Sequence, residues 1–143
     1  MNKKYSLVLL ISIVVIVAVY SFAGGGGKMD LDIGEHELSV AYEDFSATVN
    51  YEDVTAIELV EVSDFGAPVD GGSDKSCRWG TWKNDTWGEY AQYSLTSTSK
   101  GVLLYLRDGY FLLSYESGES TELLSEMLRD MLTANGYEAE YIR

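Results

Sequence analysis

The stretch Gly101–Tyr115, which reads GVLLYLRDGYFLLSY, decides most of the fold. It holds two short runs of aliphatic and aromatic residues, Val102–Arg107 and Tyr110–Tyr115, separated by Asp108-Gly109. Aromatic and β-branched residues favour strands, and Asp-Gly readily adopts the positive φ angles of a tight hairpin turn. The stretch therefore predicts a β-hairpin that turns at Asp108-Gly109.

An amphipathic helix is predicted after this hairpin, over roughly Glu119–Ala134. Six apolar residues recur there at helical spacing on one side, namely Leu123, Leu124, Met127, Leu128, Met131 and Leu132. Ser117 or Ser120 can cap the start of the helix, and Asn135-Gly136 can close its end. We expect the apolar stripe to pack against a sheet, in preference to forming a groove for a partner.

Upstream of the hairpin, alternating apolar and polar residues predict further strands. Leu38–Val49 reads as two short half-buried strands around Glu43-Asp44, Asn50–Val62 as a third, and Gly88–Leu95 as another. In contrast, Ser63–Asn84 reads as a long irregular stretch. We expect five to seven strands and one helix, which is a mainly β fold.

Two smaller segments remain to be assigned in this prediction of secondary structure. Asp70–Asp74 is a cluster of turn-forming residues inside the irregular stretch. Its two carboxylates do not have the spacing of a calcium-binding loop. Tyr137–Arg143 could add a short strand or form a tail.

Leu7–Ala23 is an uncharged apolar run that follows Lys3 and Lys4. As a helix its 17 residues would cover about 25 Å, which is short for a hydrocarbon core of about 30 Å but within the range of spanning segments. The lysines predict that residues 1–6 stay in the cytoplasm and that the rest is exported. We expect an uncleaved transmembrane anchor; the alternative is a signal peptide cleaved after Ala23, which would give a secreted protein.

The domain organisation then follows the chain. Residues 24–36 form a Gly-rich tether, and residues 37–143 form one domain. The exported part carries eight basic residues, because Lys3 and Lys4 precede the anchor, and all 23 acidic ones. Its net charge is therefore −15, compared with −13 for the whole chain. Such a surface repels nucleic acid and anionic lipid headgroups.

The predicted order of elements, a small meander capped by one helix, resembles the pleckstrin-homology (PH)-like barrel. Tyr51–Leu59 resembles a strand of bacterial PH-domain proteins, and Arg78-Trp79-Gly80 and Gly88-Glu89-Tyr90 resemble two glycine-containing steps that follow it. The hairpin and the final helix resemble the family's last elements. The resemblance, which covers roughly residues 38–132, implies a PH-like small β-barrel or sandwich behind a single N-terminal transmembrane helix.

The resemblance does not carry lipid binding to this chain. Lipid-binding PH domains have basic residues in the loop between their first two strands, where this sequence has Glu43 and Asp44. Acidic side chains repel a phosphorylated headgroup. We therefore expect attachment to the membrane through Leu7–Ala23 and not through the domain.

No motif in the sequence argues for catalysis, a cofactor or a metal. His36 is the single histidine, between two glutamates, and reads as a solvated surface residue. Cys77 is the single cysteine and excludes an internal disulfide. We expect a small, partly buried residue there, with a reactive thiol as the less favoured alternative.

Trp79, Trp82 and Trp87 are the candidate partner surface. They cluster among charged and polar residues, and tryptophan is enriched at interfaces and in ligand stacking. The alternative is that one or two of them plug an end of the barrel. The sequence thus predicts a non-enzymatic, membrane-anchored module of the bacterial envelope that binds a protein or peptide. The alternative is an envelope enzyme, or a ligand- or glycan-binding protein, with an unidentified pocket.

Overall fold

Two β-sheets and one long helix make up the computed structural model, which describes residues 29–142 of the chain. The described residues hold ten strands: β1 (Asp30–Ile33), β2 (Glu37–Tyr42), β3 (Phe45–Asn50), β4 (Val54–Glu61), β5 (Ala67–Ser73), β6 (Cys77–Asn84), β7 (Gly88–Leu95), β8 (Lys100–Leu106), β9 (Gly109–Leu113) and β10 (Glu140–Ile142). The helix is α2 (Gly118–Ala134), and a short 3₁₀ turn, η1 (Tyr51–Asp53), leads into β4. The mainly β fold with one C-terminal helix is confirmed.

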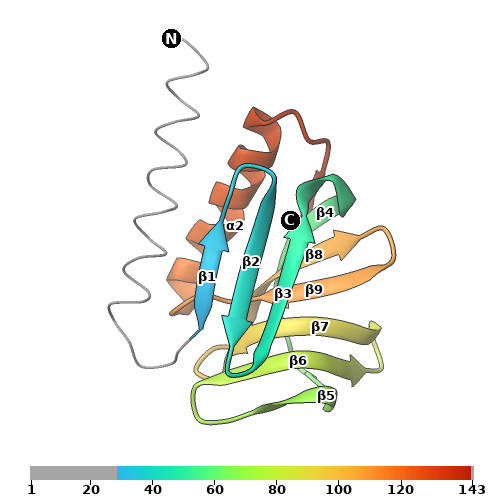
Figure 1. Cartoon of the computed structure of the whole chain (residues 1–143), viewed down its shortest axis with the longest axis vertical. Helices are drawn as coiled ribbons and strands as arrows, with labels where there is room; N and C mark the ends of the chain where they lie inside the picture. Colours follow the sequence, from blue (N-terminus) through green and yellow to red (C-terminus); the bar gives the residue numbers. More distant parts are fainter. Residues whose placement is uncertain (1–28, 143) are drawn as a thin grey trace.

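The strands form a small sheet, in the order β1-β2-β3, and a large one, in the order β10-β4-β8-β9-β7-β6-β5. The small sheet lies over the large one with its strands running across those beneath (Figure 1). Two neighbouring pairs in the large sheet, β7 with β9 and β10 with β4, are parallel. The large sheet is therefore not a meander, because several neighbouring strands are not consecutive in the chain.

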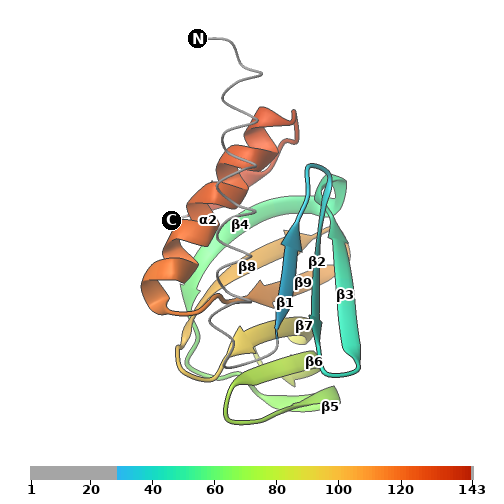
Figure 2. The ribbon, with the colours of Figure 1, turned by 60° about the vertical axis from the view of Figure 1, so that its left-hand side comes forward.

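One face of the large sheet, here called the inner face, is covered by the small sheet and by α2, which lie next to each other along it (Figure 2). Strand alternation sends Leu104 and Leu113 to this face. From the small sheet come Leu38 and Val40, and from the helix Leu128 and Met131. The main core lies in this layer.

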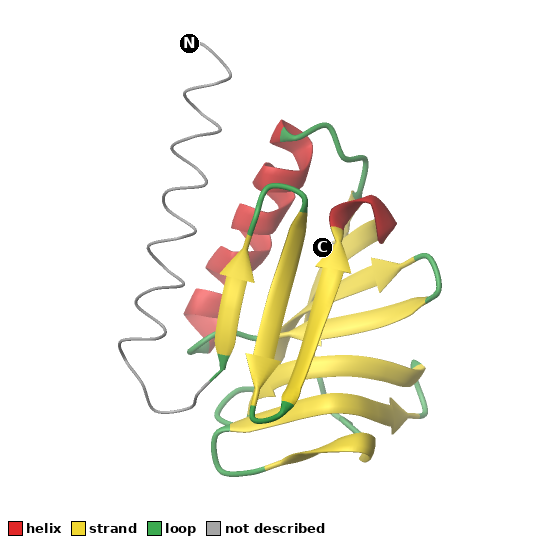
Figure 3. Cartoon of the chain, in the orientation of Figure 1, coloured by secondary structure: helices red, strands yellow, loops and turns green. Residues whose placement is uncertain are grey.

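The helix α2 is the long helix in Figure 3, with a loop at each end. Both ends follow the capping signals in the sequence. The Ser117 side chain accepts a hydrogen bond from the Ser120 N–H and caps the start. At the other end Gly136 has φ +83°, and the Gly136 and Tyr137 N–H groups donate to the Thr133 and Leu132 carbonyls. The predicted helix is confirmed, except that Leu123, placed in the apolar stripe, is 45% exposed.

The predicted hairpin is confirmed as β8 and β9, but its turn lies one residue earlier than expected. Leu106 pairs with Gly109, so Arg107 and Asp108 make the turn. Gly109 does not adopt a positive φ. The hairpin therefore depends on its two apolar strands and not on the conformational freedom of Asp-Gly.

The prediction of an irregular stretch over Ser63–Asn84 was wrong, because β5 and β6 lie within it. Asp70–Ser73, predicted as a turn, belong to β5, and the turn falls at residues 74–76. A Cβ on Gly71 would lie 2.1 Å from the Trp79 carbonyl oxygen, so glycine permits this close pairing. The strand was hidden because β5 is an exposed edge strand with a bulge and lacks a buried face.

The domain also begins before residue 37, since β1 lies within the predicted 24–36 tether. Met29, Leu31 and Ile33 are buried in the main core, and β1 pairs with β2. Leu7–Ala23 and the glycines at 24–27 lie outside the described residues. Within residues 29–142 no helix has both the length and the apolar character that crossing a membrane requires.

Candidate functional site

The three tryptophans of the candidate surface do not share one face of the molecule. Trp79 turns to the inner face, where its ring lies 5.0 Å from that of Tyr42. Trp82 and Trp87 turn to the opposite, outer face of the large sheet. Trp82 is only 5% exposed, and its indole N–H donates to the Trp79 carbonyl. Trp87, which is half-buried, is the one whose ring remains within reach of a partner on the outer face.

The outer face is crossed by the connection between β4 and β5, residues 62–66, here called the strap. Its first residue, Val62, donates its N–H to the Ser99 carbonyl beside β8. Further along, Asn84 donates to the Asp64 carbonyl, and the Tyr90 hydroxyl donates to the Phe65 carbonyl at 2.6 Å. These bonds fasten the strap near β8 at its start and to β6 and β7 further along.

Beneath the strap lies a chain of buried polar groups that starts at Arg78. The Arg78 guanidinium stacks 3.5 Å from the Phe65 ring centroid and donates to Ser94. Ser94 donates to Gln92, whose amide donates to the Tyr90 hydroxyl. Burial raises the pKa of Tyr90 and lowers that of Arg78. Because every member has a partner, this network holds the strap without leaving a buried polar group unsatisfied.

A groove of about 340 Å³ opens on the outer face beside the strap. Its walls come from the end of β4, the first half of the strap, β8, and the turn between β6 and β7. The lining residues are Glu58, Val60, Glu61, Val62, Ser63, Asp64, Asn84, Thr86, Trp87, Leu103 and Tyr105. This volume lies near the lower end of the range for small-ligand pockets, about 300–1,000 Å³.

Two aromatic residues and three carboxylates are among the residues that line this groove. Trp87 packs against Tyr110 with the ring centroids 6.2 Å apart, and Tyr110 meets Tyr105 at 5.3 Å. The charged lining residues are Glu58, Glu61 and Asp64, and no Lys or Arg lines the groove. Tyr110 itself does not line the groove, which thus combines two aromatic side chains, Trp87 and Tyr105, with three carboxylates.

Each of the three carboxylates is held by a donor of the same chain. The Tyr105 hydroxyl donates to Glu58 at 2.5 Å, the Ser99 hydroxyl donates to Glu61 at 2.7 Å, and the Gly66 N–H donates to Asp64 at 2.9 Å. The bond to Glu58, together with burial, raises the pKa of Tyr105 to about 12. The second oxygens of Glu58 and Asp64 have no partner among the described residues.

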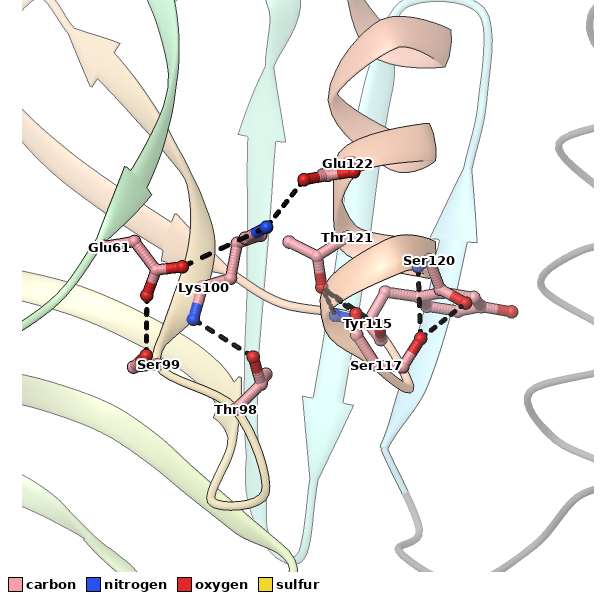
Figure 4. Close-up of polar contacts among 9 residues, drawn as sticks. All are labelled: Glu61, Thr98, Ser99, Lys100, Tyr115, Ser117, Ser120, Thr121 and Glu122. Atoms are coloured by element: carbon pink, nitrogen blue, oxygen red, sulfur yellow. Dashed lines mark hydrogen bonds and ion pairs between the residues drawn. The ribbon is translucent and has the colours of Figure 1, made fainter.

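Glu61 also belongs to a polar junction at the start of α2 (Figure 4). Lys100 lies 4.0 Å from Glu61 and donates to Glu122 on the helix at 2.6 Å. This bond to Glu122 raises the pKa of Lys100. Buried Thr121 accepts from the Tyr115 N–H and fixes the bend before the helix. Lys100 therefore bridges Glu61, which lines the groove, and Glu122 on the helix, and the shorter of its two contacts is with the helix.

The remaining singled-out residues lie away from the groove. His36 is exposed, and its Nδ1 lies 2.6 Å from the Tyr137 hydroxyl. Cys77 is fully buried, and burial raises the pKa of its thiol to about 12, which makes it unreactive. Among residues 29–142 no group of three or more His, Cys, Asp or Glu side chains is placed to hold a metal ion.

A second concavity, of about 310 Å³, lies on the free face of the small sheet. Small or polar residues such as Ser39, Ser46 and Thr48 line it, with Asp30 and Asp32 at its side. It offers no aromatic ring for stacking. The groove beside Trp87 is the better candidate site.

Sequence reasoning found only Trp87 among the groove residues. Tyr105 was assigned to the hairpin and Glu58 to a strand, and neither position indicates which face of the sheet it occupies. Asp64 belongs to the stretch predicted to be irregular. The strap forms the site, and its path across the sheet depends on long-range pairing that periodicity does not reveal.

Comparison with known protein families, with curated proteins and with solved structures finds no match to this chain.

Proposed function

We propose that this protein is a non-enzymatic interaction module held at the outer face of a bacterial cytoplasmic membrane, where it binds a protein or peptide partner in the outer groove. The observation that carries the proposal is the half-buried Trp87 beside Tyr105 in that groove. Tryptophan and tyrosine dominate binding energy at protein interfaces because they bury a large area with few rotatable bonds.

Two features of the sequence support the location. The uncharged Leu7–Ala23 run follows two lysines, which is the pattern of an anchor with a cytoplasmic N-terminus. Cleavage after Ala23 would instead release the same domain in secreted form. The acidic domain is unsuited to binding anionic lipid. The anchor would therefore supply the membrane attachment, and the groove would remain available to a partner.

The PH-like barrel remains part of this proposal. Two stacked sheets and a C-terminal helix on one face of the large sheet support it. The acidic β2–β3 turn, Glu43-Asp44, argues against the phosphoinositide binding associated with many PH domains. Under this proposal the chain shares the stacked sheets and the final helix of the PH-like architecture, departs from its meander in strand order, and uses a different surface.

A second candidate is an envelope protein that binds or hydrolyses a glycan. Aromatic platforms and carboxylates in one groove are the residue types that sugar-processing sites use. Three carboxylates already held by hydrogen bonds from their own chain suit this function less well, because hydrolysis needs one of them as a proton donor. Incubation with cell-wall glycan fragments, read by mass spectrometry, tests it.

The test of the main proposal is crosslinking in intact cells that carry the full-length chain. A photoreactive residue replaces Thr86, which lines the groove, or Thr133, which is exposed on α2. We expect a discrete crosslinked product from position 86, lost when Trp87→Ala is added, and none from position 133. Equal products from both positions, or none from either, would count against a groove-bound partner.

A further inference from the structure

We propose that the outer groove recognises a cation, namely a lysine or arginine side chain on a basic segment of the partner. The inference rests on the proposed interaction function and specifies the chemistry of its ligand. It follows from the joint placement of Glu58, Asp64 and Trp87 in one groove.

The charges of the groove favour a positive ligand. The three charged residues that line it are carboxylates, in a chain whose net charge is −13. Lys100 forms ion pairs with Glu122 at 2.6 Å and with Glu61 at 4.0 Å. Glu61 is thus ion-paired within the chain, while Glu58 and Asp64 have no ion pair among the described residues. An anionic or neutral ligand would leave these two charges uncompensated.

The aromatic side chains indicate an organic cation rather than a metal ion. Trp87 and Tyr105 both line the groove, and a Lys or Arg head over such rings is attracted by their negative faces. A metal ion would need several ligands converging on one point, and among residues 29–142 no three His, Cys, Asp or Glu side chains are placed to hold one. The groove volume of about 340 Å³ suits one long side chain with its neighbouring backbone.

The site is also organised before any ligand binds. Tyr105 fixes Glu58, the Gly66 N–H fixes Asp64, and the hydrogen bonds of the strap fix the backbone between them. The second oxygens of Glu58 and Asp64 remain without a partner in the described part of the chain. Little ordering entropy is then lost when an ammonium or guanidinium group donates to them.

The experiment titrates the intact protein, in detergent micelles, with three probes: tetralysine amide, the same peptide with every side-chain amine acetylated, and tetraglutamate. We expect saturable binding of tetralysine amide, at least tenfold weaker binding of the acetylated peptide, and none of tetraglutamate. Equal affinity for the lysine peptide and its acetylated form would overturn the inference.

Matched variants separate the groove from the general acidity of the surface. Glu58→Gln, Glu61→Gln and Asp64→Asn together remove three charges from the groove. Glu126→Gln, Glu138→Gln and Asp44→Asn remove three charges from exposed positions that do not line it. We expect the first set to weaken binding of tetralysine amide more than tenfold and the second less than threefold. An equal loss in both sets would show bulk attraction and overturn the inference.

Trp87→Ala is an independent test, because this substitution does not change the net charge. We expect it to weaken binding of tetralysine amide at least fivefold, and unchanged binding would contradict the role of the ring. If position 86 still crosslinks to a partner in cells but tetralysine amide does not bind, the proposed function stands and the cation inference fails. If neither occurs, both fail.

Discussion

The two faces of the large sheet differ in how they are covered. Two separate elements, the small sheet and α2, seal the inner face with apolar side chains. The outer face is covered by one strap of five residues over a buried polar chain, and an acidic aromatic groove remains open beside it. The inner face therefore accounts for most of the stability, while the outer face has the features of a binding surface.

The largest effect is expected from truncation on the inner face. Leu113 on β9 is fully buried in the main core, and Leu113→Ala should lower the free energy of unfolding by about 2–5 kcal/mol. Trp87→Ala on the outer face should cost about 1 kcal/mol, because the ring is half-exposed. Urea denaturation measures both. Equal costs would remove the distinction between the two faces.

The next effect concerns the strap. Gly66 has φ +80°, and an added Cβ would lie 1.8 Å from the Lys83 carbonyl oxygen. Gly66→Ala should therefore displace the strap and cost about 1–3 kcal/mol. Gly109→Ala is the control, since nothing lies within 4 Å of its added Cβ, and it should change stability by less than about 0.5 kcal/mol. A neutral Gly66→Ala would mean that the strap is not held in place as described.

A smaller, pH-dependent effect is expected where the two sheets meet at Asp74. Its carboxylate accepts from the Tyr42 hydroxyl and from the N–H groups of Cys77 and Ser76, which together lower its pKa. A lowered folded-state pKa gives stability that is complete above the unfolded value, about 3.9, and is lost as the pH falls through the folded value.

Asp74→Asn should therefore unfold at a lower temperature than the unmodified protein at pH 7. The difference should shrink as the pH falls below about 4, where the native carboxyl also becomes neutral. Thermal melts across this range measure it, with exposed Asp44→Asn as the control. A difference that is constant down to pH 2 would show that the ionised carboxylate is not what matters.

The smallest effect is spectroscopic and concerns the groove. The bond from Tyr105 to Glu58 raises the pKa of Tyr105 to about 12. Glu58→Gln removes the charged acceptor, so this pKa should fall toward the usual value near 10. NMR titration with ring-labelled tyrosine resolves the change. A pKa that does not move would show that burial alone sets it.

The sequence predicted well those elements whose residues carry their own signals. The α2 helix has a serine cap, a glycine stop and a clear stripe, and the β8–β9 hairpin has two apolar runs. The turn was shifted because strand pairing, and not the Asp-Gly pair, sets the register. The strand β5 was missed because its glycines and exposed edge position leave no alternation to read.

The groove could not be predicted from the sequence, for a related reason. Trp79, Trp82 and Trp87 are neighbours in sequence, but alternation along β6 sends Trp79 and Trp82 to opposite faces. Trp87, in the turn between β6 and β7, packs on the same face as Trp82. Glu58 and Trp87 are far apart in sequence, and the strap and the strand order of the large sheet bring them together. Such contacts depend on tertiary pairing, for which a single sequence gives no local signal.

The most direct test of the account follows the three tryptophan indole N–H signals in an amide correlation spectrum during addition of tetralysine amide. The Trp82 indole is bound to the Trp79 carbonyl, and that of Trp79 is buried on the inner face. We predict that the Trp87 signal shifts saturably while the other two stay in place. If the Trp87 signal stays in place, or if the Trp79 signal moves with it, the outer groove is not the binding face.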